Sequence, residues 1–213
     1  MSLTHSNMIA RFFIVLATTV FITLVHAQTA DPKPLIDKTV NAVGGKDKLL
    51  TIFRIKEIFH FGSTPEPAEG KKRSTRESVL EMPGWWWVNQ KERAVEPAKD
   101  DVWAWTLGIL VAEKSKIEVI PELTDEGKVC FGLKVSGSVT PAMSLYFDQE
   151  TSLLKRLDWR GDFYRFSDWR EHDGVKYASK TIILKGKDNK PWFFHEVLEV
   201  ERLAKLPEGL TKP

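Results

Sequence analysis

The chain contains 213 residues, of which 42% are hydrophobic and 28% are charged, and its formal net charge is +2. This composition is typical of a globular domain and excludes disordered and fibrous classes, while the small net charge argues against binding to nucleic acid. The single cysteine, Cys130, excludes an internal disulfide and a multi-cysteine zinc site.

The beginning of the chain has the pattern of a secretory signal peptide. Arg11 precedes an apolar run over residues 12–25, and the small-x-small pattern of residues 25–27 follows it. The run is shorter than the roughly 20 apolar residues that a spanning helix needs. We therefore expect a signal peptide over residues 1–27, cleaved near Ala27, and an exported, periplasmic domain over residues 28–213 that does not span a membrane.

The first two elements differ in the period of their apolar residues. Residues 31–43 repeat with helical spacing and stop at Gly44 and Gly45, which predicts a short amphipathic helix. Residues 52–61 alternate, which predicts a half-buried strand. One face of this strand is apolar with a single exception, Glu57, and its apolar positions are Phe53, Ile55, Phe59 and Phe61.

Short turns then separate a series of alternating segments. We predict strands over residues 72–81, 85–90, 129–135, 143–147, 153–159, 163–170, 175–185 and 191–203. Residues 101–113 fit either a strand or a helix, and the acidic pair Asp100 and Asp101 favours the helix. That helix is either a static part of the core or a lid that moves when a ligand enters.

The order of these elements predicts an α+β fold that is mainly β. A long series of consecutive strands forms an antiparallel sheet, and a large twisted sheet of this kind curls toward a barrel. The helices are expected to cover its concave face. Where they fill only part of the interior, an apolar pocket remains.

Three segments of the sequence carry a family resemblance. They are residues 40–45, residues 145–154 and residues 168–176, and the C-terminal residues 203–213 add to them. Together they resemble exported bacterial proteins of the lipoprotein-carrier (LolA-like) superfamily. The resemblance implies an incomplete β-barrel capped by helices, with a hydrophobic cavity that some members use to shield lipid chains.

Aromatic residues are the most unusual part of the composition. Trp85, Trp86 and Trp87 are consecutive, so on a strand Trp86 points away from the other two. The outer ring either packs under a helix or loop, lines an acyl-chain pocket, or stacks on carbohydrate. As ligand-binding residues we predict Phe53, Phe59, Phe61, Trp85, Trp87, Trp103, Trp105, Leu107, Phe131, Phe147 and Trp159.

Catalytic and metal-binding patterns are not apparent in the sequence. His60, His172 and His195 have no metal-ligand spacing, and we assign them to a polar strand face, a turn and an outward strand position, respectively. No G-x-S-x-G elbow or phosphate-binding loop occurs. We therefore expect no catalytic residue, no metal and no cofactor.

We expect an exported, monomeric binding protein that holds a lipid, an acyl chain or a lipoprotein in an apolar half-barrel. A periplasmic carrier is one form that this function could take. The alternative is an envelope sensor or protein-interaction module on the same fold, whose partner is an envelope protein. An enzyme is the third hypothesis, and it lacks a recognisable nucleophile and base.

Overall fold

The computed structural model describes residues 31–92, 98–210 and 212. The predicted signal peptide and its cleavage point near Ala27 lie outside these residues. Within them, no helix combines the length and the apolar character needed to cross a membrane.

The N-terminal helix α1 (Lys33–Ala42) follows Pro32, and the chain then turns at Gly44 toward the short 3₁₀ helix η1 (Lys46–Lys48). Gly44 has φ of 116°, and a Cβ there would lie 2.0 Å from the carbonyl oxygen of Gly174. Glycine is required for this close approach. The amide of Lys176 also donates to the carbonyl of Val43 (2.9 Å), so two segments of the family resemblance meet in space.

All eleven strands belong to one antiparallel sheet with the order β4-β3-β2-β1-β11-β10-β9-β8-β7-β6-β5. Strands β1 to β4 are Ile52–Phe61, Ser74–Glu81, Trp85–Val88 and Lys91–Glu92. Strands β5 to β8 are Lys116–Asp125, Lys128–Ser136, Met143–Asp148 and Leu154–Trp159. Strands β9 to β11 are Asp162–His172, Val175–Lys185 and Pro191–Arg202. Because β4 and β5 are the two edges of this order, the sheet does not close into a barrel.

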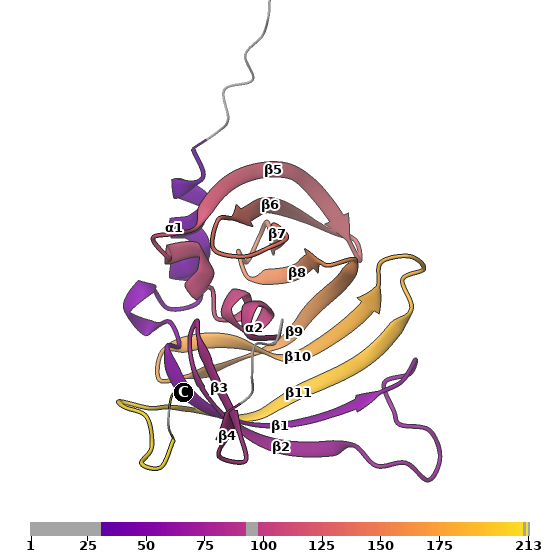
Figure 1. Ribbon diagram of the computed structural model, residues 1–213. Helices are drawn as coiled ribbons and strands as arrows, with labels where there is room; N and C mark the ends of the chain where they lie inside the picture. The colour runs from indigo at the N-terminus through magenta and orange to yellow at the C-terminus, as the bar shows by residue number, and fades with distance from the viewer. Residues whose placement is uncertain (1–30, 93–97, 211, 213) are drawn as a thin grey trace, which may run out of the picture.

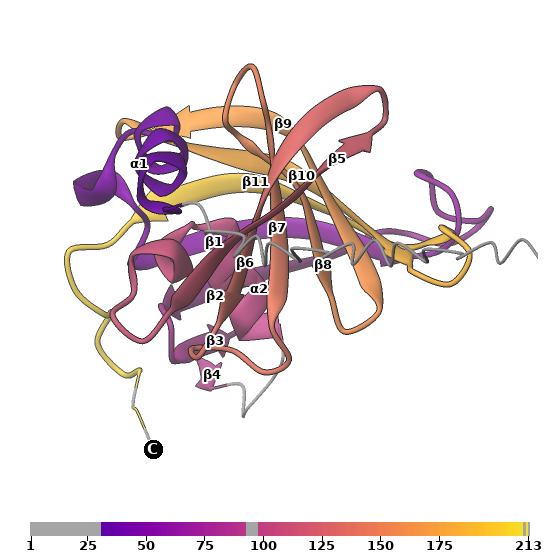
Figure 2. The same cartoon turned by 90° about the horizontal axis from the view of Figure 1, so that it is seen from above.

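The sheet curls around α2 (Ala98–Trp105) and the 3₁₀ helix η2 (Gly108–Val111), which lie on its concave side (Figures 1 and 2). The buried core fills one part of the interior, where Leu107 and Ile109 pack with Leu133, Leu145 and Leu157. The predicted fold class, a mainly β protein with a curled antiparallel sheet and helices on the concave face, is therefore confirmed.

Two predicted elements need correction. The helix expected over residues 101–113 is broken, because Leu107 has φ of 59° between α2 and η2. Strand β5 was missed, since Pro121 lies in its middle and its pairing with β6 is irregular between Ile120 and Leu123. Proline is tolerated there because β5 is an edge strand and its outer N–H groups have no ladder partner.

Candidate ligand-binding cavity

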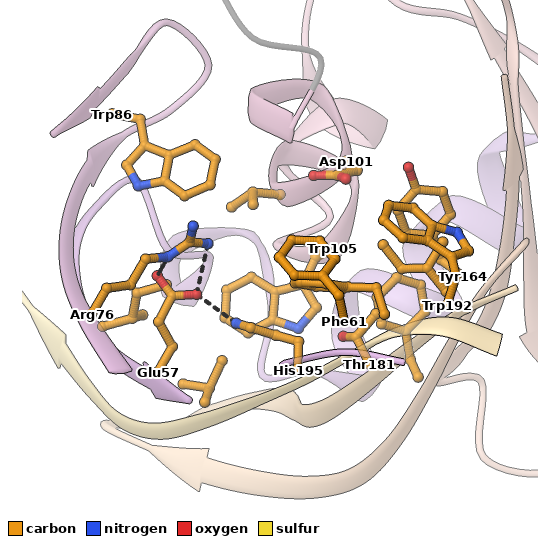
Figure 3. A pocket seen from close by; sticks show the side chains of 16 residues that line it. Glu57, Phe61, Arg76, Trp86, Asp101, Trp105, Tyr164, Thr181, Trp192 and His195 are labelled. Atoms are coloured by element: carbon orange, nitrogen blue, oxygen red, sulfur yellow. Dashed lines mark hydrogen bonds and ion pairs between the residues drawn. The ribbon is translucent and has the colours of Figure 1, made fainter. Parts of the chain in front are cut away.

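A cavity of about 380 Å³ lies between α2 and the concave face of the sheet (Figure 3). Val102 and Trp105 form its wall on the helix side. The wall on the sheet side is largely apolar and includes Ile55, Phe166, Ile183 and Val197. A volume above 300 Å³ lined mainly by apolar side chains is characteristic of small-molecule sites.

Exposed aromatic rings form one end of the cavity. Phe61 is 68% exposed, and its ring stacks on Trp192 with the centroids 6.0 Å apart. Phe193 packs against both rings, with its centroid 5.1 Å from that of Phe61. Phe61 therefore gives this end of the cavity an apolar surface that is exposed to solvent.

Trp105 fixes α2 above the sheet. Its indole Nε1 donates to the carbonyl of Ala178 on β10 (2.9 Å). Its ring packs on Phe53 and Tyr177, with centroids 6.2 Å and 6.1 Å away. The C-terminal end of α2 is therefore anchored by a hydrogen bond and by ring packing, while Val102 and Asp101 face the cavity one turn earlier.

A charged cluster is buried in the opposite wall (Figure 3). Glu57 is 1% exposed, and Arg76 on β2 donates to it from Nε (2.6 Å) and Nη2 (3.1 Å). Ser78 donates to the same carboxylate (2.8 Å), and His195 Nε2 lies 2.5 Å from it. Burial alone raises the pKa of Glu57, but the hydrogen bonds from His195 and Arg76 outweigh burial and lower it to about 2.

The guanidinium of Arg76 is held on both sides by aromatic rings. It lies 4.8 Å from the centroid of Phe59 and 4.9 Å from that of Trp86. Cation–π contacts of this kind contribute about 0.5–2 kcal/mol each. Together with the two bonds to Glu57, they leave Arg76 with a single orientation toward the cavity.

Asp101 and Tyr164 face this cluster across the cavity (Figure 3). Burial raises the pKa of Asp101 to about 8, although hydrogen bonds from the Val102 amide and from Tyr164 act in the opposite direction. Asp101 is therefore mostly protonated at neutral pH, whereas Glu57 is ionised. The two carboxyl groups of one cavity differ in charge because, among the described residues, Glu57 has a cationic hydrogen-bond partner and Asp101 has none.

The predicted ligand-binding residues fall into three groups. Phe61 and Trp105 line the cavity, and Phe59 lies beside it against Phe61 and Arg76. Several others are core residues, namely Phe53, Trp103, Leu107, Phe131, Phe147 and Trp159. The rings of Trp85 and Trp87 stack on each other with centroids 6.3 Å apart and do not line the cavity, whereas Trp86 does. The predicted opposition of Trp86 to its neighbours is correct, and it is Trp86, and not Trp85 or Trp87, that lines this cavity.

The prediction for His195 is also wrong. It was assigned to an outward position, but it lies on the concave face, paired with Phe59 on β1 and Thr181 on β10. His60 occupies the opposite face, where it stacks on Phe194 with centroids 5.0 Å apart. Glu57 and His195 were not predicted as site residues, although the charge of Glu57 on an otherwise apolar strand face was a visible signal.

Solved structures similar to this chain are found by comparison of the fold. No protein-family model and no curated protein matches the chain. A solved LolA superfamily protein from Nitrosomonas europaea is 8% identical and covers 87% of this chain and 99% of its own, with a TM-score of 0.53. A DUF1329 family protein from Desulfovibrio piger is 11% identical over 84% of this chain and 96% of its own, with a TM-score of 0.51.

The chain has the LolA-like fold. At 8% and 11% identity, this likeness concerns the fold and not the side chains of the site. The family resemblance of the sequence is thus confirmed for the LolA-like architecture, with its open sheet and its helix on the concave face.

The pKa of Asp101 predicts how stability depends on pH within this LolA-like fold. The usual value is 3.8, so between pH 3.8 and about 8 the folded chain binds a proton that the unfolded chain has lost. Its contribution is complete below about pH 4 and is lost as the pH rises through 8, at up to about 1.4 kcal/mol per pH unit. Asp100, Tyr164 and Arg76 face the same carboxyl group.

Urea unfolding from about pH 5 to about pH 9 measures this effect. As the pH rises, the native chain should lose free energy of unfolding relative to Asp101→Asn, because Asn has no proton to lose. Asp188→Asn, in the exposed turn between β10 and β11, is the matched control and should follow the native chain. Parallel curves for Asp101→Asn and the native chain would refute the assignment.

Proposed function

We propose that this protein is an exported binding protein that holds an apolar ligand, a lipid acyl chain, in the cavity beneath α2, and that it catalyses no reaction. The observation that carries this proposal is the apolar space left open between Trp105 and Val102 on the helix and the concave face of the sheet. Empty apolar cavities are destabilising, and burying a ligand methylene contributes about 0.8 kcal/mol. A chain of about ten buried methylenes would thus supply roughly 8 kcal/mol before the entropic cost of binding.

The polar cluster supports binding over catalysis. Ser78 is completely buried and donates to Glu57, and His195 contacts the same carboxylate from the other side. A serine nucleophile needs a base that accepts its own proton. Here, the acceptor of that proton, Glu57, is a weak base, because its hydrogen bonds with His195 and Arg76 lower its pKa to about 2.

Binding can be tested by purifying the exported chain gently and analysing it by native mass spectrometry, with titration of a fluorescent fatty acid as a second readout. We expect co-purified lipid, or stoichiometric binding of the fluorescent fatty acid. Lipid-free protein that binds no probe would contradict the proposal and favour the protein-interaction module.

A cavity-filling substitution locates the ligand. Thr181 lies on the cavity wall, so Thr181→Trp should occupy the space and reduce probe affinity by at least about tenfold. Lys180→Trp is the matched control, because adjacent residues of a strand face opposite sides and Lys180 is exposed. Equal affinities of the two variants would place the ligand elsewhere.

A further inference from the structure

The acidic side chain Glu57 on the cavity wall has little hydrogen-bonding capacity left for a ligand. Both oxygens of Glu57 are occupied within the chain: Oε1 accepts from Arg76 Nε and Ser78, and Oε2 accepts from Arg76 Nη2 and His195. A carboxylate that already accepts four hydrogen bonds has little capacity left for a ligand. Glu57 is therefore a positioning residue, which aims Arg76.

Three of the polar groups that remain for a ligand can donate hydrogen bonds. The two bonds from Arg76 to Glu57 use Nε and Nη2 and leave Nη1 for another acceptor. The buried Nε1 of Trp192 has no hydrogen-bond partner within the described residues. Asp101, which faces Arg76 across the cavity, is mostly protonated because burial raises its pKa to about 8, and a protonated carboxyl group can also donate.

The size of the cavity limits the number of chains. Ligand cavities span roughly 300–1,000 Å³, and this one, at about 380 Å³, lies near the lower limit. It matches one extended chain better than the several chains of a diacyl or triacyl lipid. The apolar wall between Trp105 and Ile183 suits that chain, and Arg76, with Asp101 facing it across the cavity, suits an oxygen acceptor at its end.

We propose that the cavity selects single-chain amphiphiles that end in an anionic oxygen headgroup, a carboxylate or a phosphate monoester, with the headgroup at Arg76 and the chain beneath α2. This inference rests on the proposed function and adds the class of ligand. The half-buried guanidinium provides a charge-assisted hydrogen bond to the anion. A cationic headgroup would meet the same guanidinium and is excluded by repulsion.

The test compares ligands that share one chain and differ only in the headgroup. Hexadecanoic acid, hexadecyl phosphate, hexadecanol and hexadecyltrimethylammonium compete for the site against a fluorescent fatty acid. Both anions should bind at least about tenfold more tightly than the alcohol, and the ammonium should bind most weakly. Tighter binding of hexadecyl phosphate than of hexadecanoic acid would indicate a phosphate monoester as the natural headgroup. The reverse order would indicate a carboxylate.

Two further comparisons test a ligand with two acyl chains and small anions that have no chain. A diacyl phosphatidic acid should bind more weakly than hexadecyl phosphate. Acetate and inorganic phosphate should not compete, because they bury no chain. Competition by either small anion at a concentration similar to that of hexadecanoic acid would contradict the role of the apolar wall.

The double variant Glu57→Gln/Arg76→Gln removes both charges of the pair and keeps polar side chains of similar size. It should bind the alcohol as the native chain does but lose the preference for the anions. Arg73→Gln, whose exposed ion pair with Glu66 lies away from the cavity, is the matched control and should keep the preference. If the double variant fails to fold, Asp101→Ala, which removes a donor from the cavity and leaves the Glu57–Arg76 pair in place, should still weaken both anions relative to the alcohol at neutral pH.

The outcomes separate this inference from the proposed function. Equal binding of anion, alcohol and ammonium would overturn headgroup selection and leave apolar binding intact. Tighter binding of a two-chain lipid would overturn the single-chain class. If none of these chains binds, both the proposed function and this inference fail.

Discussion

Arg76→Ala is expected to destabilise the protein by about 3–5 kcal/mol, because it removes the cationic partner of a carboxylate that is 1% exposed. Glu57 would keep only Ser78 and His195 as hydrogen-bond partners. The variant also loses ring contacts with Phe59 and Trp86. Chemical denaturation at neutral pH measures the loss as a lower midpoint.

Two variants distinguish this expectation from a general sensitivity of the sheet. Lys56→Ala removes an exposed ion pair with Glu199 on the outer face of β1, the strand that carries Glu57. It should lower the free energy of unfolding by less than about 1 kcal/mol. Glu57→Gln/Arg76→Gln leaves no buried charge unpaired and should be more stable than Arg76→Ala. Equal losses of stability in Lys56→Ala and Arg76→Ala would show that the ion pair of Glu57 and Arg76 behaves as an exposed pair and not as a buried one.

The same cluster contributes to the acid dependence of stability. The pKa of Glu57 is lowered from its usual 4.5 to about 2, so the unfolded chain binds more protons between these values. The stabilisation is complete above about pH 4.5 and is lost as the pH falls toward 2. In Glu57→Gln, this part of the acid dependence should disappear.

Trp105→Ala is expected to cost about 3–5 kcal/mol and to release α2 from the sheet. The substitution empties the space between Phe53 and Tyr177 and removes the hydrogen bond to the carbonyl of Ala178. Thermal unfolding measures the loss of stability, and hydrogen exchange of the α2 amides measures the release of the helix.

The control for this prediction is another tryptophan of the same cavity. Trp192 is only partly buried and lies at the exposed aromatic end, so Trp192→Ala should cost less than about 2 kcal/mol and leave exchange in α2 unchanged. Slow exchange of α2 in Trp105→Ala would show that other contacts hold the helix.

Alternation predicted the strands well where one face is apolar and the other is charged. Strand β1 is such a case, and its prediction over residues 52–61 agrees with the observed bounds. Strand β11 begins with Pro191 and three consecutive aromatic residues, so its pattern does not reveal which face is buried. For this reason His195 was assigned to the wrong face.

Pairing irregularities explain why the site could not be assembled from the sequence. The register between β1 and β11 shifts between Lys56 and Glu57, and that between β10 and β11 shifts between Ile183 and Leu184. Each irregularity changes which residues oppose each other across the sheet. The contact between Glu57 on β1 and His195 on β11, which are 138 positions apart, depends on the first of these shifts.

The sequence by itself determined the mainly β character, the helix over α1 and the unusual position of a charge on the apolar face of β1, because these follow from local periodicity and composition. Only the tertiary structure decided that Trp86 faces the cavity, that Arg76 and His195 converge on Glu57, and that α2 leaves part of the interior open. Periodicity specifies which side chains share a face. How tightly a sheet curls, and how much of its concave side a helix fills, depends on contacts between residues far apart in the chain, and no local pattern encodes them.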